Sequence, residues 1–337
     1  MHPDVAIALS FLTDLPRQAL TERLHADDPE LLERAASVRS IAEDVRGRAA
    51  ATGIEAVAWN DPRFPAQLLA IGDCPPALWC RGSLECLGAP LVAIVGSRAA
   101  SAVSLEIAAR VAADLADRGV TVVSGLARGV DSAAHRGALQ KGNSVAVLGS
   151  GLDRVYPAEH ARLAEAIARN GVVLSEFPPG TPPLPFHFPL RNRVISGLSR
   201  AVVVIEASDK SGSLITASCA LEQGREVMAV PGNALSGRNR GGHALIRDGA
   251  TIVECADDIL IQLGLQTSEP EEVTSMPPDR ASADPVLVHM HAGHPYDLDA
   301  LARATGLDVP RLLPRILEFE LAGRIRRVDG GRFIRCA

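Results

Sequence analysis

Several polar segments of this chain contain residue types that hold phosphate groups in proteins, and each follows a run of apolar residues. Gly96, Ser97 and Arg98 come directly after one such run, and Ser101 follows at the start of a helical stretch. Glycine admits a closely approaching group, backbone N–H groups at a helix start attract anions, and arginine adds a forked donor. These residues predict a phosphate-binding loop, although a tight turn with a solvent-facing arginine would have the same sequence.

A second segment of this type opens a later helix. It consists of Lys210, Ser211, Gly212, Ser213 and, one turn further on, Thr216. The segment lacks the G-x-x-x-x-G-K-[ST] spacing of a nucleotide-binding P-loop, so we interpret it as a more general anion site. Another loop carries Arg238 and Arg240. One mononucleotide would not occupy so many phosphate-compatible loops. They predict that the ligand is a polyanion that lies across several of them.

Arg191, Asn192 and Arg193 lie in a stretch that contains no acidic residue between Glu176 and Glu206. Arginines two positions apart do not share a face of a helix, but near its start they can contact two successive phosphates. Alternatively, one of the two forms a buried ion pair, for example with Glu206, and anchors the core. The sequence leaves both possibilities open, and we include all three residues in the predicted groove.

Asp131 and His135 are four residues apart on a predicted helix and could form an acid–base pair. We favour a structural interpretation, in which the aspartate caps the helix and the histidine bonds to a neighbouring loop. The six cysteines form no C-x-x-C pair and have no histidine at zinc-finger spacing. We therefore expect no catalytic residues, no metal and no cofactor.

The composition is that of a globular protein, and its charge limits how the chain could contact nucleic acid. The 337 residues are 47% hydrophobic and 22% charged, with a formal net charge of −6. These values exclude a disordered chain or a fibrous rod, and the length predicts two or three domains. The negative charge argues against coating nucleic acid by bulk charge, but not against a local basic groove. Aromatic residues make up only 3%, so we expect phosphate contacts to outweigh stacked rings.

The sequence gives no sign of a membrane or secretory segment. No apolar run reaches the ~20 residues of a membrane-spanning helix, and Met1 is not followed by a basic segment with a long apolar core. The cysteines form no disulfide framework, which fits a reducing compartment. We therefore expect a cytoplasmic protein without membrane contact.

The polar segments must be positioned by the apolar runs that precede them. These runs lie at 91–95, 120–123, 145–148, 172–174, 201–205 and 227–230. They alternate with longer helical stretches, which predicts an α/β fold with a Rossmann-like, doubly wound, mostly parallel sheet. Ligands of such sheets bind at the carboxyl ends of the strands, where the phosphate-compatible loops lie.

The first part of the chain differs from this centre. Leucines at helical spacing predict several short helices in residues 1–50, and residues 55–90 have the turn formers of a connector. Residues 1–90 contain 8 basic and 13 acidic residues, so we do not expect this segment to bind DNA by itself. The predicted domains are a helical domain at 1–60, a Rossmann-like domain at 61–263, a polar linker at 264–285 and a winged helix at 286–337.

Residues 286–337 predict three helices followed by a strand pair, the arrangement of a winged helix. Arg311 and Arg315 are four apart on its third helix, and Arg326 and Arg327 lie on the predicted wing. These arginines could contact DNA, or the domain could contact another protein, as many winged helices do. The residues alone do not decide between the two roles.

Taken in order, the motifs resemble those of the DprA/Smf DNA-processing family. The matching segments are GSR at 96–98, SGLARGVD at 124–131, FPLRNR at 188–193, SGSLITA at 211–217, VPG at 230–232 and LIRDGA at 245–250. The resemblance implies a Rossmann-like core that binds single-stranded DNA without sequence preference, usually as a homodimer. It also implies a small SAM-like helical domain before the core and a winged helix after it.

The same resemblance implies a role and a set of contacts. Members of this family protect incoming strands in natural transformation and load a RecA-type recombinase onto them, without enzymatic activity. The resemblance places Ser97 and Arg98 in the first phosphate loop, Arg191 and Arg193 along the groove, and Lys210 to Ser213 in the later loop. We also include Arg128, from the SGLARGVD segment, among the predicted DNA-binding residues. An alternative is an enzyme on a related scaffold, such as a nucleoside-monophosphate phosphoribohydrolase. The Pro-Gly-Gly-x-Gly-Thr loop of those enzymes does not occur here.

Overall fold

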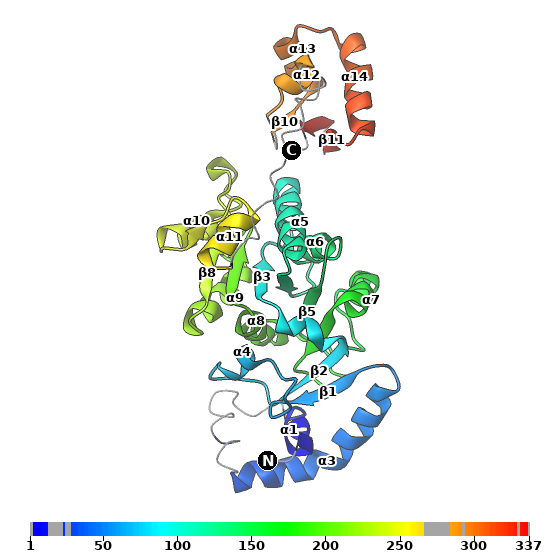
Figure 1. Ribbon diagram of the computed structural model, residues 1–337, viewed down its shortest axis with the longest axis vertical. Coiled ribbons are helices and arrows are strands. Elements are labelled where there is room, and N and C mark those ends of the chain that lie inside the picture. The colour runs from blue at the N-terminus through cyan, green and yellow to red at the C-terminus, as the bar shows by residue number, and fades with distance from the viewer. Residues whose placement is uncertain are drawn as a thin grey trace. The chain divides into compact units, whose positions relative to one another are not determined.

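The computed structural model describes residues 3–12, 23, 28–265, 284–291, 294–328 and 331–335 (Figure 1). The chain forms two compact units, Met1–Thr267 and Ser268–Ala337. The linker expected at 264–285 lies almost entirely outside the described residues. The domain boundaries expected at residues 60 and 263 stay predictions.

A nine-stranded sheet forms the centre of the first unit. Its strands are β1 (Glu55–Ala58), β2 (Ala77–Gly82), β3 (Leu91–Val95), β4 (Thr121–Ser124), β5 (Ser144–Leu148), β6 (Val172–Ser175), β7 (Ala201–Val204), β8 (Glu226–Ala229) and β9 (Thr251–Ile252). They lie in the order β1-β2-β6-β5-β4-β3-β7-β8-β9. The strands from β6 to β9 are parallel, and β1 and β2 are antiparallel additions at one edge. This order confirms the predicted Rossmann-like, mostly parallel α/β fold.

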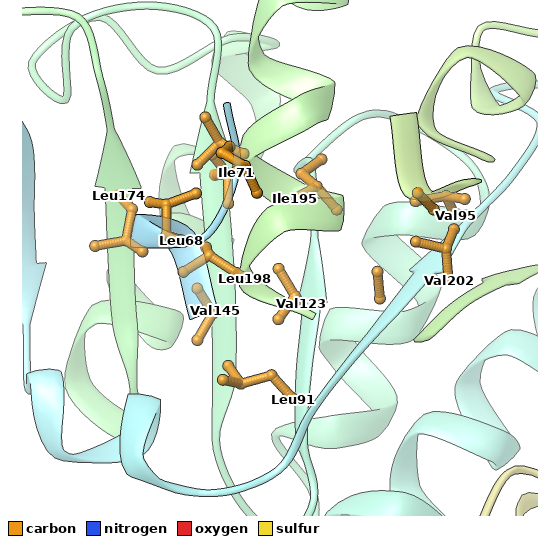
Figure 2. Close-up of a cluster of buried hydrophobic side chains, with 14 of the residues drawn as sticks. Leu68, Ile71, Leu91, Val95, Val123, Val145, Leu174, Ile195, Leu198 and Val202 are labelled. Atoms are coloured by element: carbon orange, nitrogen blue, oxygen red, sulfur yellow. The ribbon is translucent and has the colours of Figure 1, made fainter. Parts of the chain in front are cut away.

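Helices pack on both faces of the sheet, which explains why its central strands are apolar throughout (Figure 1). They include α5 (Ala102–Asp117), α6 (Val130–Ala138), α7 (Ala161–Asn170), α8 (His187–Leu198), α9 (Ser213–Glu222), α10 (Arg240–Arg247) and α11 (Ala256–Gln262). Leu91, Ala93 and Val95 of β3 enter one core cluster, whereas Val92 and Ile94 enter another. Figure 2 shows the first of these clusters, in which α8 packs over the sheet. The core thereby fixes the position of α8.

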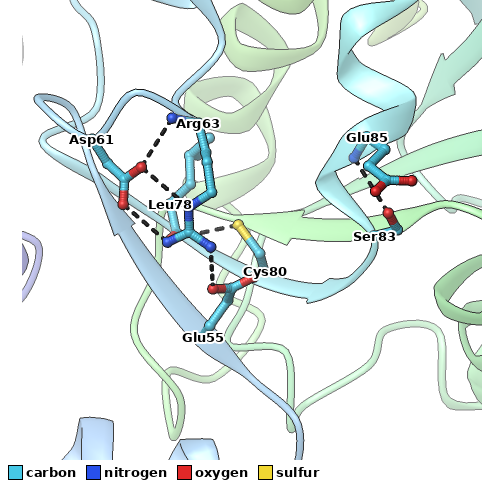
Figure 3. Close-up of polar contacts among 7 residues, drawn as sticks. All are labelled: Glu55, Asp61, Arg63, Leu78, Cys80, Ser83 and Glu85. Atoms are coloured by element: carbon cyan, nitrogen blue, oxygen red, sulfur yellow. Dashed lines mark hydrogen bonds and ion pairs between the residues drawn. The ribbon is translucent and has the colours of Figure 1, made fainter.

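Residues 55–90, which we expected to form a connector, instead extend the sheet. β2 pairs antiparallel with β6, and β1 pairs antiparallel with β2. Arg63 fixes the turn after β1 by donating to Glu55 at 2.8 Å and to Asp61 at 2.9 Å (Figure 3). The two strands are short and bordered by Asn-Asp-Pro and Pro-Pro segments, and these turn formers dominate the local sequence signal.

The N-terminal segment also differs from expectation, because residues 29–50 form one long helix where we expected short ones. The structure has α1 (Pro3–Leu9) and the 22-residue α3 (Pro29–Ala50). Asp28 caps α3 by accepting from two backbone N–H groups of its first turn. Ion pairs four residues apart, such as Arg39–Glu43 at 3.0 Å, support its exposed face. The leucines at 15, 20 and 24 lie outside the described residues.

The second unit has its own small core. Its elements are α12 (Pro285–Val288), β10 (Pro295–Tyr296), α13 (Leu298–Thr305), α14 (Val309–Leu321), β11 (Ile325–Val328) and β12 (Arg332–Arg335). β12 lies between β10 and β11, and Leu301, Leu312, Ile316 and Phe333 pack beneath the sheet. Three helices followed by a strand pair confirm the predicted winged helix. No helix within the described ranges of either unit is long and apolar enough to cross a membrane.

Candidate functional site

A cleft of about 610 Å³ opens at the carboxyl ends of the parallel strands. It lies where the chain reverses the direction of strand addition, with β4 on one side of β3 and β7 on the other. Such switch points are the usual ligand sites of doubly wound sheets. The cleft is lined, among others, by Gly96, Ser97, Arg98, Asp131, Tyr156, Phe188, Arg191, Asn192, Ser211, Gly212, Ser213 and Thr216. The structure thus brings together most of the predicted site residues from three separate segments.

Two glycines allow the loops after β3 and β4 to pack against each other. A Cβ atom on Gly96 would lie 2.6 Å from the Val130 side chain. Gly129 has a φ of +77°, and a Cβ atom there would lie 2.2 Å from the Ser97 carbonyl oxygen. Val130 N–H donates to the same carbonyl at 3.2 Å. Because the loops touch through their backbones, Ser97 and Arg98 are held at the mouth of the cleft.

Arg98 is the exposed cation of the cleft. Its guanidinium lies 5.6 Å from the centre of the Phe188 ring, a cation–π contact, and Phe188 lies 5.5 Å from the Tyr156 ring. Within the described part of the chain, Arg98 forms no ion pair with a carboxylate. The chain has few aromatic residues, but two of them meet beside this arginine. The low aromatic content of the sequence did not predict this contact, because composition does not show where in the fold the aromatic residues lie.

Arg191 lies at the base of the cleft and is buried. Its Nη1 donates to the Val147 carbonyl at 2.7 Å, and it occupies the space where Gly125 lacks a side chain. Burial lowers the pKa of Arg191 to about 10 and raises the pKa of Asp131 above its usual range, while attraction between the two opposes both shifts. Its Nε has no hydrogen-bond partner among the described residues. This Nε is itself buried, so Arg191 contributes positive charge to the base of the cleft rather than an accessible donor.

Arg193, which we expected to line the groove, lies behind the cleft. Its side chain is 5% exposed, and Nη2 donates to Glu176 at 2.6 Å while Nε lies 3.3 Å from Asp73. Residues two apart on α8 point to different sides, so only Arg191 faces the cleft. The sequence left open whether both arginines contact phosphates or one of them forms a buried ion pair. Arg193 forms the buried ion pair. Its partner is Glu176 rather than Glu206.

Glu206 instead occupies the helix start that we predicted to hold a phosphate. Its carboxylate accepts from the Ser101 hydroxyl and the Ser104 hydroxyl, each at 2.8 Å, and from the Ser101 N–H. An internal carboxylate thus satisfies the first turn of α5. Ser101 is not among the residues that line the cleft. Its role is to position the loop that carries Arg98.

The remaining predicted residues lie at the edges of the cleft. Arg128 forms a two-point ion pair with Glu159 at 2.7 and 2.8 Å and lines a small side pocket with Arg98 and Tyr156. Asn192 donates to the Gly212 carbonyl at 3.3 Å and so connects α8 to the later loop. Lys210 precedes that loop and is exposed, but it does not line the cleft.

Asp131 and His135 do not form an acid–base pair. Asp131 accepts from the Ala127 N–H at 3.2 Å and stabilises the loop after β4. His135 contacts the Ser144 hydroxyl at 2.7 Å, and burial lowers its pKa from 6.5 to about 3. Both residues have structural contacts, but these differ from the expected ones. Gly129 rather than Asp131 is the N-cap of α6, with no side-chain cap bond, and the partner of His135 is the first residue of β5 rather than a loop.

The arginines predicted in the winged helix are mostly engaged with their neighbours. Arg315 pairs with Asp284 at 2.8 Å, Arg311 lies 3.7 Å from Asp308, the Arg327 guanidinium lies 5.2 Å from the Phe333 ring, and Arg326 is exposed on the wing. Leu313, Leu317 and Leu321 are exposed along α14. An apolar stripe on the third helix favours a protein contact over DNA recognition. The role of these four arginines in DNA binding stays a prediction.

The fold and the cleft define a class of protein: a Rossmann-like sheet with a cleft of glycine, serine and arginine residues at its switch point, joined to a winged helix. Within this class, the chain belongs to the DprA/Smf family. Residues 55–264 match the family of DNA recombination-mediator protein A, and residues 270–331 match the DprA winged helix domain.

Relatives match most of the chain. Protein Smf of Escherichia coli K12 is 45% identical over 276 residues, which cover 80% of this chain and 74% of that protein. The structure of DNA processing protein A from Streptococcus pneumoniae has a TM-score of 0.65 at 37% identity, covering 77% of this chain and 92% of that one. The structure of DNA processing protein A from Helicobacter pylori, described for its single-stranded DNA binding mode, has a TM-score of 0.57 at 29% identity. The match covers 62% of this chain and 95% of that one.

Proposed function

We propose that the cleft binds single-stranded DNA through its phosphates and its exposed bases, without sequence preference. One observation carries the proposal: the exposed guanidinium of Arg98, without a carboxylate partner in the described part, lies beside the rings of Phe188 and Tyr156. A single strand presents phosphates and unstacked bases together, whereas a duplex hides its bases. The relative from Helicobacter pylori, a single-stranded DNA binder, supports this assignment.

The loops around the cleft supply phosphate contacts in addition to Arg98. Ser97 and the turn from Ser211 to Ser213 offer hydroxyl and backbone donors, and the buried Arg191 adds positive charge at the base of the cleft. These groups do not read base edges in a fixed pattern. Binding is therefore expected to depend on salt and hardly on sequence.

The experiment is a mobility-shift titration of single- and double-stranded DNA of the same sequence. Arg98→Ala should weaken single-strand binding equally for every sequence, because it removes a phosphate contact. The matched control is Arg169→Ala, since Arg169 is exposed in the last turn of α7. Helices of such sheets run antiparallel to the strands, which places Arg169 at the edge opposite the cleft. Equal binding by both variants would refute the site.

We further propose that the protein delivers the bound strand to a RecA-type recombinase and protects incoming DNA during natural transformation. Membership in a recombination-mediator family supports this role. The test follows filament formation by the recombinase on DNA already covered by a single-strand-binding protein. The chain should shorten the lag, and Arg98→Ala should not. An unchanged lag with the intact chain would contradict the role.

We propose a homodimer that forms at the β9 edge of the sheet. Ile252 is exposed on β9 itself. Leu221 and Ile261 are exposed on α9, which packs on β7 and β8, and on α11, which follows β9 in the chain. Exposed apolar residues near a short edge strand are suited to a protein contact. Light scattering should give twice the chain mass, and Ile252→Glu should give a monomer with an intact fold. A monomeric wild type would contradict the proposal.

A further inference from the structure

The loop that follows β8, residues 231–240 and here called the β8 loop, presents an unusual side chain. Leu235 at its tip is 97% exposed, more than any other large apolar side chain in the described part of the chain. The loop does not line the cleft, and the function proposed above makes no use of it. Single exposed leucines are common on protein surfaces. The surroundings of this one distinguish it.

The base of the β8 loop is fixed at the carboxyl edge of the sheet. Asn239 is buried, accepts from the Ala207 N–H after β7 at 2.9 Å, and donates to the Val230 carbonyl after β8 at 2.9 Å. Asn233 accepts from the Leu235 N–H at 2.8 Å and starts a single helical turn. Leu235 is thus held outward by a defined turn at the same edge as the cleft.

The β8 loop also touches the wall of the cleft. Arg238 donates from Nη1 to the Ala99 carbonyl at 3.0 Å, and Ala99 lines the cleft next to Arg98. Arg238 and Arg240 are both exposed, and neither pairs with a carboxylate within the described ranges. Two arginines without anionic partners therefore continue the positive charge of Arg98 toward Leu235.

We infer that the β8 loop is a second contact for single-stranded DNA, which continues the path of the strand beyond the cleft. Arg238 and Arg240 contact successive phosphates, and Leu235 packs against a base or between two bases. Nucleic-acid-binding proteins use apolar side chains as wedges in this way, and any base offers a face to such a contact. The inference rests on the proposed function of the cleft.

Oligonucleotide length separates the two contacts experimentally. We would measure fluorescence anisotropy with labelled oligo-dT from about 4 to about 16 nucleotides, a range typical of single-strand sites. Leu235→Ser should bind the shortest oligonucleotides as wild type does, and bind the longest about 5-fold more weakly. This is the lower end of the effect of an aromatic ring stacked on a base, since leucine offers a smaller contact. Arg240→Ala should lower the dependence of log K on log[salt] by about 0.7 for long strands only. Leu321→Ser is the matched control, because Leu321 is 82% exposed on the winged helix.

A gain of contact provides an independent readout. Leu235→Trp should bind long strands at least as tightly as wild type, and the indole fluorescence of this variant should be quenched by long strands but not by the shortest.

Equal affinities of wild type and Leu235→Ser at every length, with no quenching in Leu235→Trp, would overturn the inference. If Arg98→Ala still weakens binding at all lengths, the cleft remains the site. Absence of binding by wild type at any length would overturn both proposals. A changed oligomeric state of Leu235→Ser with unchanged DNA affinity would assign Leu235 to a protein contact and overturn the inference.

Discussion

Arg191 and Arg193 belong to the same turn of α8 and have different tasks. Arg191 forms the base of the cleft, and Arg193 joins α8 to Glu176 after β6 and to Asp73 before β2. A buried ion pair adds little to stability by itself, but removing one partner leaves a buried charge uncompensated. Arg193 thus acts on DNA binding only through the position of α8.

Arg193→Ala should lower the free energy of unfolding by about 3–5 kcal/mol, because the Glu176 carboxylate loses its guanidinium while it remains buried. Urea titration would measure this loss, and the DNA affinity of the folded fraction should stay close to wild type. Arg98→Ala is the matched comparison, with unchanged stability and weaker DNA binding. If Arg193→Ala were as stable as wild type but bound DNA weakly, Arg193 would contact DNA directly, and the structural role assigned to it would be wrong.

His135 should make the fold sensitive to acid. Its pKa falls from 6.5 to about 3 on folding, so below pH 6.5 the unfolded chain takes up a proton that the folded chain does not. The contribution of His135 to the free energy of unfolding is therefore fully present above pH 6.5. As the pH decreases toward 3, this contribution falls by up to about 1.4 kcal/mol per pH unit. Urea midpoints between pH 7 and pH 5 would measure the slope. His135→Gln should show a smaller slope, and an equal slope would contradict this assignment.

At the scale of elements, the central strands are predictable because both of their faces are buried. Six apolar runs marked β3 to β8, and the loops after them contained most of the cleft residues. β1 and β2 were missed because turn formers border them. Helical structure was expected in residues 1–50, but the length of α3 was not, because ion pairs and a cap, rather than a broad apolar face, support it. The burial of Arg193 and the Ser101–Glu206 contact depend on side-chain packing between distant segments, which spacing along the chain does not reveal.

The winged helix should be dispensable for binding DNA in the cleft. All residues that line the cleft lie in the first unit, which has its own core. A chain ending at residue 265 should therefore bind single-stranded DNA with nearly the wild-type affinity in a titration. A large loss of affinity would instead assign a DNA contact to the second unit, with Arg311, Arg315, Arg326 and Arg327 as the first candidates.

At the scale of the whole molecule, the net charge of −6 conceals an uneven distribution. Residues 1–90 have a net charge of −5, whereas residues 91–263 have a net charge of +1. In the second of these segments the exposed Arg98, Arg238 and Arg240 lie at one edge of the sheet. Screening by salt should therefore weaken DNA binding even though the protein is acidic.

The salt dependence of single-strand affinity tests the central claim most directly. Log K for oligo-dT should fall linearly with log[salt] for wild type and for Arg169→Ala. Arg98→Ala should bind more weakly at low salt, and its slope should be smaller by about 0.7, the value for one lost phosphate contact on a single strand. Identical slopes and affinities for wild type and Arg98→Ala would show that the DNA does not lie in this cleft.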